Sequence, residues 1–306
     1  MTALALLNRA IDLVRESAGQ PVKLRKLLAE HPHARVAIQE KPASIAMDDV
    51  VRWDELSSAL RLAWRTSRSL RGWGLHRGHY SSISVDRPEI DVFGQSEIAA
   101  SFSCDIQDVS GLLSSKNDLS NFECMDEWIQ RASPELIAPV SATKLAENLA
   151  HRGVRVAGHG DSDYFCRYAW DGRLFLVNED GSHHFAAARY IAKRIKSPVQ
   201  LRAPLHTRSI RKQAVESLTR DFEIFLLYDS PAVSNGFHDA MKSMEATWFW
   251  HPLPRQYEDC KAVYLPRSES KSMLAANVLR SAGIEDLGRY WSTLVGRQRS
   301  DMAVNR

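Results

Sequence analysis

The sequence predicts an α+β fold in which a mixed sheet carries a central unit of hairpin, loop and helix, after a mainly helical N-terminal region. Three observations predict it: helical spacing of apolar residues before residue 80, short strand-like runs after Pro88, and an Asp171-Gly172 dipeptide between two such runs. Apolar residues make up 44% of the chain and charged residues 25%, ordinary globular values that exclude a disordered or fibrous class.

Apolar spacing in the first part of the chain predicts helices over residues 1–16, 23–31 and 47–70, the last ended by glycines at 72 and 74. Segments 89–93 and 98–104 are instead typical of strands. This change predicts two domains, a helical N-terminal region over 1–85 and an α+β domain over 86–306.

The centre of the chain predicts a hairpin of strands 164–170 and 173–178. A two-residue turn at Asp171-Gly172 would place Tyr164 opposite Glu179 and Cys166 opposite Val177. Continued beyond the strands, this pairing brings loop 159–163 close to loop 179–184. A helix over 136–150 precedes the hairpin, and helical spacing from Phe185 predicts another that ends before Pro198.

The remaining segments alternate between the two patterns. Strands are predicted over 199–205, 222–228 and 262–265, helices over 209–219, 273–282 and 287–295, and a loop over 230–236. No run of eighteen apolar residues and no signal peptide is present, so a membrane span is not expected. The four cysteines are far apart without a CxxC pair, which favours the reducing cytoplasm over a zinc or disulfide framework.

The loop that precedes the central helix is the candidate functional site. A glycine loop between a strand and a helix directs backbone N–H groups and the positive end of the helix dipole at a ligand, usually a phosphate. Ser182 is expected to cap the helix, and His183 or Glu179 to act as the catalytic base. The predicted ligand-binding residues of this loop are Asp180, Gly181, Ser182 and His184.

A basic tract follows the same helix. Between residues 187 and 220 the chain carries nine Lys or Arg and one acid, a balance that suits an anionic ligand or a solvated basic face. From this tract we expect Arg208, Arg211 and Lys212 to face the same pocket. Arginines also interleave with tryptophans between residues 52 and 77, as they do on nucleic-acid-binding surfaces.

A divalent cation is expected beside the loop. Asp161, Asp163, Glu179 and Asp180 would repel one another and a phosphate unless a cation bridged them, so we predict a metal held by His159, Asp161 and Asp163. The alternative is a zinc or other transition-metal site formed directly by histidines and acids of the two loops, although the spacing matches no known signature.

The stretch Leu174 to Tyr190 resembles the nucleotide-binding box of the ParB and sulfiredoxin superfamily, where a strand enters a glycine-rich turn and an alanine-rich helix. Gly181 takes the glycine place, Ser182 the variable place and His183 the histidine place, whereas His184 stands where the superfamily usually has arginine. The resemblance implies binding of ATP or CTP with Mg²⁺. The chain also resembles a bacterial family of domains of unknown function, through GSHHFAAARY and SATKLAENL.

These observations predict a nucleotide-binding protein, a phosphotransferase or nucleotide hydrolase, whose partner is a nucleotide or another phosphate-containing ligand. Two alternatives stay open. One is a non-catalytic nucleic-acid-binding or partition-like module, and the other is a metal-dependent nuclease or other hydrolase.

Overall fold

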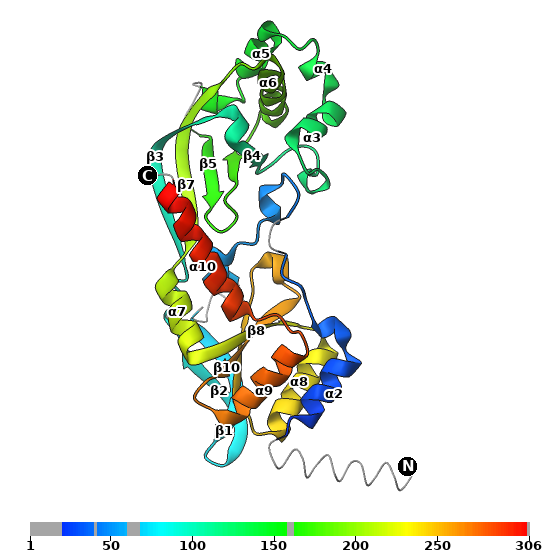
Figure 1. Cartoon of the computed structure of the whole chain (residues 1–306), viewed down its shortest axis with the longest axis vertical. Coiled ribbons are helices and arrows are strands. Elements are labelled where there is room, and N and C mark those ends of the chain that lie inside the picture. Colours follow the sequence, from blue (N-terminus) through cyan, green and yellow to red (C-terminus); the bar gives the residue numbers. More distant parts are fainter. Residues whose placement is uncertain (1–19, 40–41, 60–67, 158–161, 305–306) are drawn as a thin grey trace. The chain divides into compact units, whose positions relative to one another are not determined.

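The structure is a computed structural model that describes residues 20–39, 42–59, 68–157 and 162–304. The chain forms two compact units, residues 1–38, 52–94 and 210–296 in one and 39–51, 95–209 and 297–306 in the other. Both contain helices and a sheet, which confirms the α+β class (Figure 1). The predicted division at residue 85 differs from these units, because each is assembled from separate stretches of the chain.

The first unit is built on an antiparallel sheet of order β2-β1-β9-β10-β8. Its helices α2, α8 and α9 lie together beside this sheet (Figure 1) and share a core with Phe225, Val263 and Phe237. The strands are β1 (Ser69–His76), β2 (His79–Asp86), β8 (Phe222–Tyr228), β9 (Trp248–Pro252) and β10 (Cys260–Pro266). The helices are α2 (Val22–Glu30), α7 (Lys212–Asp221), α8 (Pro231–Ser243), α9 (Ser270–Ser281) and the start of α10 (Leu287–Val304).

The predicted helix over 47–70 is wrong in its described part. The chain there forms 3₁₀ turns at Met47–Asp49 and Trp53–Ala59 and then enters β1. Gly72 lies inside β1, where a Cβ atom would stand 1.9 Å from the Trp248 carbonyl oxygen. This glycine therefore allows close approach to β9 and does not end a helix.

Two further local predictions are wrong, and a third lies outside the described residues. Residues 89–93, expected as a strand, form a turn, and residues 230–236, expected as a loop, begin α8. The hydroxyl of Ser230 caps α8 and Pro231 occupies its first turn, a start signal that the loop assignment missed. The helix predicted over 1–16 lies outside the described residues.

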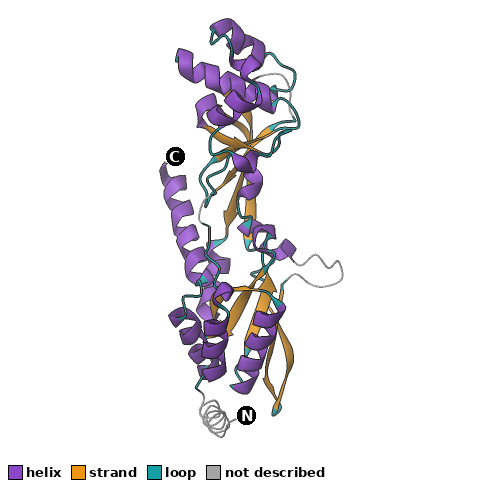
Figure 2. Cartoon of the chain, turned by 90° about the vertical axis from the view of Figure 1, so that its right-hand side faces the viewer, coloured by secondary structure: helices purple, strands orange, loops and turns teal. Residues whose placement is uncertain are grey.

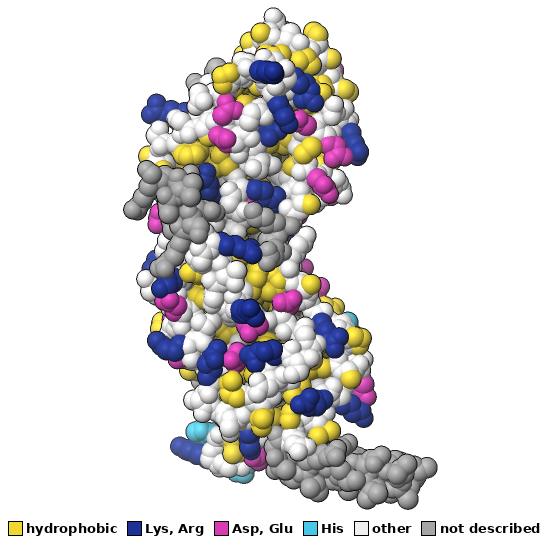
Figure 3. Space-filling view, in the orientation of Figure 1, with side chains coloured by type: hydrophobic (Ala, Val, Ile, Leu, Met, Phe, Trp, Pro, Cys, Tyr) yellow, Lys and Arg dark blue, Asp and Glu magenta, His cyan; other side chains and the backbone are white. Residues whose placement is uncertain are grey.

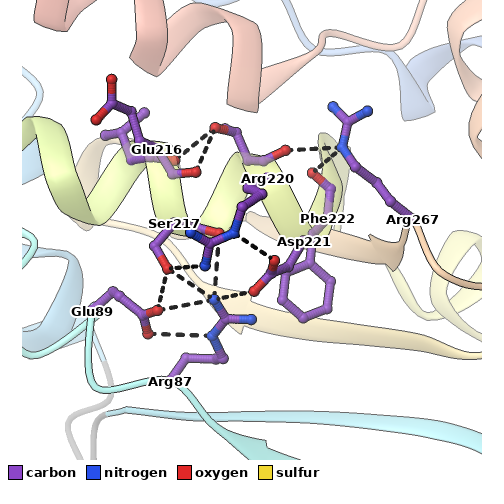
Figure 4. A network of polar contacts seen from close by, with 10 residues as sticks. Arg87, Glu89, Glu216, Ser217, Arg220, Asp221, Phe222 and Arg267 are labelled. Carbon is purple, nitrogen blue, oxygen red and sulfur yellow. Dashed lines mark hydrogen bonds and ion pairs between the residues drawn. The ribbon is translucent and has the colours of Figure 1, made fainter.

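A polar network ties the segment after β2 to α7 (Figure 4). Arg87, only 9% exposed, contacts carboxylate oxygens of Glu89 at 3.0 Å and Asp221 at 2.9 Å. Ser217 donates to Glu89 at 2.5 Å. Burial raises the pKa of Glu89, but the hydrogen bonds from Arg87 and Ser217 outweigh it and lower the pKa to about 2. The network thus keeps a carboxylate ionised beside a nearly buried arginine.

The second unit holds a mixed sheet of order β3-β7-β5-β6-β4, in which β4 runs parallel to β6, and β5 runs parallel to β7 and antiparallel to β6. Helices α3 to α6 gather together (Figure 1), as a layer above the strands in Figure 2. The strands are β3 (Gly94–Asp105), β4 (Val109–Leu112), β5 (Tyr164–Tyr168), β6 (Leu174–Val177) and β7 (Gln200–Ile210). The helices are α3 (Met125–Ala132), α4 (Pro134–Ile137), α5 (Ala142–Leu149) and α6 (Ser182–Ile195).

The central hairpin is present, but its predicted register is wrong by two residues. Tyr164 pairs with Val177 and Cys166 with Phe175. The connection spans residues 169–173 because the N–H groups of Asp171 and Gly172 both donate to the Tyr168 carbonyl, at 3.0 and 2.9 Å. A shift of two keeps every side chain on its predicted face, and the start of β5 still lies beside the end of β6, where Tyr164 pairs with Val177.

No helix in the described part of the chain combines the length and apolarity needed to cross a membrane.

Candidate functional site

A pocket of about 560 Å³ lies in the second unit, where the parallel strands β4 and β6 end. Residues 114–116, directly after β4, and residues 179–184, which lead from β6 into α6, form most of its wall, with Ser133 and His151 completing it. The carboxyl ends of parallel strands are a recurrent place for ligand sites, because the loops that follow them diverge there.

The start of α6 is open towards this pocket. Gly181 occupies the N-cap position with φ of +79° and has no side chain with which to cap the helix. The N–H groups of Ser182, His183 and His184 belong to the first turn and so lack intrahelical partners. A Cβ atom on Gly181 would lie 2.3 Å from the Gly153 carbonyl oxygen, so glycine is required by contact as well as by φ.

Ser182 was predicted to cap the helix, but its hydroxyl has other partners. Its buried hydroxyl donates to the Ser114 carbonyl at 2.7 Å and accepts from Asn178 Nδ2 at 3.0 Å. Ser114 in turn donates to the Asn178 carbonyl at 3.1 Å. Ser182 therefore joins the segment after β4 to the loop after β6. At the helix end, the Asp180 carboxylate accepts the Gly181 N–H at 2.7 Å.

His183 contacts two hydroxyl groups with its two ring nitrogens. Nδ1 lies 2.8 Å from Ser133 Oγ, and Nε2 lies 3.3 Å from Ser115 Oγ. The Trp128 ring packs edge-on against the imidazole with centroids 4.8 Å apart. The ring is thus held from three sides, and Ser115 is a pocket residue that the sequence did not single out.

The tautomer of His184 is determined by a buried amide. Asn148, 1% exposed, donates through Nδ2 to the carbonyls of Leu136 and Lys144, both at 2.9 Å. Its Oδ1 must therefore accept, and it lies 3.0 Å from His184 Nδ1. His184 consequently carries its proton on Nδ1 and keeps an acceptor lone pair on Nε2.

His151 stacks on the ring of His184, with centroids 3.8 Å apart and planes at 8°. Its Nδ1 accepts the Gly153 N–H at 3.1 Å, so the short segment that packs against Gly181 also orients this imidazole.

Both neighbouring histidines of α6 favour the neutral form. Burial lowers the pKa of His183, helped by the charge of Lys116 and opposed by Glu135. Burial also lowers the pKa of His184, together with the charges of His151 and His183. Near neutral pH these rings therefore favour the neutral form, which can accept a proton.

Asp163 and Glu179, one acidic residue from each loop, contact the same arginine. Arg155 Nη1 lies 3.2 Å from Asp163 Oδ1 and 3.7 Å from Glu179 Oε2. Burial raises the pKa of Asp163 against the opposing charge of Arg155. The side chain of Glu179 is 84% exposed, so it lacks the enclosure expected of a base. Arg155 thus places a positive charge beside Asp163 and Glu179.

The structure describes only one of the three residues of the predicted metal site. His159 and Asp161 lie outside the described residues, and the described ones contain no group of three or more His, Cys, Asp or Glu side chains that could hold an ion. Asp163 Oδ2 is buried without a hydrogen-bond partner among the described residues, so one oxygen of the predicted set remains suited to a cation.

The predicted cationic residues do not line the pocket. Arg208 pairs with Tyr168 at the turn end of β5, whereas the pocket is at the other end, where Tyr164 meets Val177. Arg211 and Lys212 belong to the first unit, where Lys212 pairs with Glu216 at 2.7 Å. The cation that does line the pocket is Lys116.

The pocket residues missed by the sequence analysis are Ser114, Ser115, Lys116, Ser133 and His151. One signal was available, because Ser-Ser-Lys directly follows the apolar run that forms β4. The other residues come from segments whose approach depends on tertiary packing.

Comparison with known proteins identifies the family to which the chain belongs. Residues 99–304, about two thirds of the chain, match a family of unknown function, DUF6685, and this range contains every pocket residue. No curated protein and no solved structure shows significant similarity to the chain. The chain belongs to DUF6685, a family of unknown function.

Proposed function

We propose that the pocket at the start of α6 binds the phosphate group of a small ligand. The observation that carries this proposal is the uncapped first turn of α6, whose N–H groups at Ser182, His183 and His184 open into a pocket that also holds Lys116. Helix N-termini of this kind bind phosphate through backbone N–H groups and the helix dipole.

The histidines of the pocket are suited to a ligand that undergoes a reaction with proton transfer. Neutral His184 carries its proton on Nδ1, toward Asn148, so its Nε2 can accept a proton. His183 contacts the hydroxyl of Ser115 through Nε2 and can likewise accept a proton there. A nucleotide is the leading candidate, because the Leu174 to Tyr190 segment resembles a nucleotide-binding box and the pocket volume of about 560 Å³ is within the range of small-molecule sites. The proposed activity is phosphoryl transfer or hydrolysis, with ATP or CTP and Mg²⁺ as the first ligands to try.

A nucleic-acid-binding role has weaker support. Arg189, Lys193 and Arg194 of the basic tract all contact the carboxylate of Asp126, at 3.0, 3.4 and 3.4 Å. On the face drawn in Figure 3, Lys and Arg side chains are interspersed with Asp and Glu and form no continuous basic stripe. A duplex-binding surface needs several cations in one field.

The proposal is tested by calorimetric titration of the whole chain with inorganic phosphate, ATP and CTP, each with and without Mg²⁺. Lys116→Ala should weaken phosphate binding about 10-fold to 100-fold, the effect of one charge-assisted hydrogen bond of about 1.5–3 kcal/mol. Lys193→Ala is the matched control, since Lys193 lies on α6 but pairs with Asp126. Equal weakening by both variants would point to non-specific attraction and contradict the proposal.

A further inference from the structure

Ser115 is part of a continuous chain of hydrogen bonds that runs through His183 to Ser133. The Asn117 N–H donates to Ser115 Oγ at 3.3 Å, and Ser115 Oγ lies 3.3 Å from His183 Nε2. At the other end, Ser133 Oγ lies 2.8 Å from His183 Nδ1 and donates to the Ala132 carbonyl, also at 2.8 Å.

The far end of this chain determines its direction. A serine hydroxyl has one proton, and when Ser133 donates it to Ala132, its oxygen can only accept from His183 Nδ1–H. The imidazole then presents the Nε2 lone pair to Ser115, whose own proton points at that lone pair. The opposite tautomer would leave the Ala132 carbonyl without this donor.

We infer that Ser115 is the nucleophile of this pocket, that His183 is its general base, and that Ser133 positions the imidazole in the required tautomer. A nucleophile within hydrogen-bond reach of a base, which is oriented by a third group, is the arrangement that activates a serine. The substrate class is a phosphate monoester, such as a nucleoside monophosphate, and not the anhydride bonds of ATP or CTP. This choice rests on the phosphate binding of the proposed function.

The reaction that follows is balanced by water alone. Ser115 Oγ forms a bond to phosphorus while the bond from phosphorus to the leaving oxygen breaks. His183 Nε2 takes the Ser115 proton and delivers it to the leaving alcohol. Water then attacks the phosphoserine, His183 takes a proton from that water, and Ser115 recovers it as inorganic phosphate leaves.

Two features of the pocket can neutralise charge on the transferred group, opposite the carboxylates of Glu179 and Asp180 that also line it. Lys116 follows Ser115 directly in the chain, and both line the pocket with the uncapped turn of α6. Because phosphoryl transfer depends mainly on positioning and on neutralising the oxygens of the moving group, a lysine and backbone N–H groups are suitable partners for it.

Nucleophile activation is tested with diethyl 4-nitrophenyl phosphate, a neutral triester that phosphorylates activated serines and releases nitrophenolate. The whole chain should acquire one diethylphosphoryl group, located at Ser115 by peptide mass spectrometry. Ser115→Ala should abolish labelling, and His183→Gln should slow it by about 100-fold or more, the usual contribution of a general base. Ser281→Ala is the control, because the exposed Ser281 hydroxyl donates to a backbone carbonyl in the first unit and does not line the pocket.

Ser133 has its own test as a positioning residue. Ser133→Ala should slow labelling at every pH, and Ser133→Thr, which retains a hydroxyl, should restore it. The wild-type labelling rate should rise with pH around a midpoint below the ordinary histidine value, because burial lowers the pKa of His183.

Labelling that is absent, or spread equally over Ser114 and Ser115, would overturn the inference. So would an unchanged labelling rate in His183→Gln. The triester carries no charge, so this result is separable from phosphate binding: a chain that binds phosphate but is never labelled refutes the nucleophile alone, and a labelled chain that does not bind phosphate refutes the phosphate monoester and the proposed function.

Discussion

Replacing Gly181 by alanine is the sharpest perturbation of the pocket. Gly181 has φ of +79°, a conformation that costs an alanine about 1–2 kcal/mol. In addition, the new Cβ would stand 2.3 Å from the Gly153 carbonyl oxygen and 2.4 Å from its carbonyl carbon. Both are backbone atoms, so the clash can be relieved only by moving the 151–153 segment or the first turn of α6.

Gly78 provides a matched control for this substitution. It has the same φ of +79°, but nothing lies within 4 Å of the position where its Cβ would be. Gly78→Ala should therefore lose only the conformational part, about 1–2 kcal/mol. Gly181→Ala should lose about 2–5 kcal/mol, because relieving the contact adds a packing change of about 1–3 kcal/mol to the conformational part.

The assay is chemical denaturation of both variants and wild type, followed by phosphate titration of the folded proteins. Gly181→Ala should also lose phosphate binding, because the shift displaces the N–H groups of α6, whereas Gly78→Ala should bind as wild type does. If the two variants were equally stable and bound phosphate equally well, the structural reasoning about this turn would be refuted.

Three further predictions concern titratable groups. Asn148→Asp would place a carboxylate against His184 Nδ1 and should raise the pKa of His184 by about one unit or more, measured by NMR titration of its ring proton; an unchanged pKa would contradict the contact. Because burial lowers the pKa of His183 and His184, the unfolded chain binds more protons, so the free energy of unfolding should fall as pH drops below about 6.5. A double His183→Gln, His184→Gln variant should lose less over that range in denaturant titrations, and an equal loss would exclude these rings as the source. Glu89, with its pKa lowered to about 2, should stabilise the fold above its ordinary pKa and lose that contribution as pH falls from about 4.5 to 2. Glu89→Gln should therefore be about 1–3 kcal/mol less stable at neutral pH, with the difference shrinking in acid; a constant difference would argue against the ionised network.

The local part of the site was predictable because its signals lie close together in the sequence. A strand, a glycine and an amphipathic helix follow one another between Leu174 and Ile195, and the structure has β6, Gly181 and α6 in that order. The choice of His183 as a base also rests on this local order. The features of the site that depend on neighbouring residues could therefore largely be predicted from the sequence.

The rest of the pocket depends on contacts between distant segments. Ser115, Ser133 and Asn148 reach the α6 histidines across 68, 50 and 36 residues of chain. No pattern of neighbouring residues predicts contacts between segments so far apart in the sequence. The contacts of Arg155 with Asp163 and Glu179 also could not be predicted from neighbouring residues alone.

The predictions of the hairpin register and of β1 were wrong because tertiary contacts outweigh the preferences of the local sequence there. The indole of Trp170 donates to the Val51 carbonyl at 3.1 Å, and Asp171 binds Arg173 with both carboxylate oxygens at 2.7 Å. These contacts hold a loop wider than the two residues that Asp171-Gly172 favours alone. In β1, Gly72 gives close strand packing although glycine usually weakens a strand.

The measurement that tests the central claim most directly is amide NMR of the ¹⁵N-labelled chain during titration with inorganic phosphate. If the first turn of α6 binds phosphate, the amide resonances of Ser182, His183 and His184 should shift together and saturate, with smaller changes elsewhere. Shifts confined to surface lysines and arginines, or a linear drift without saturation at these three amides, would contradict the account.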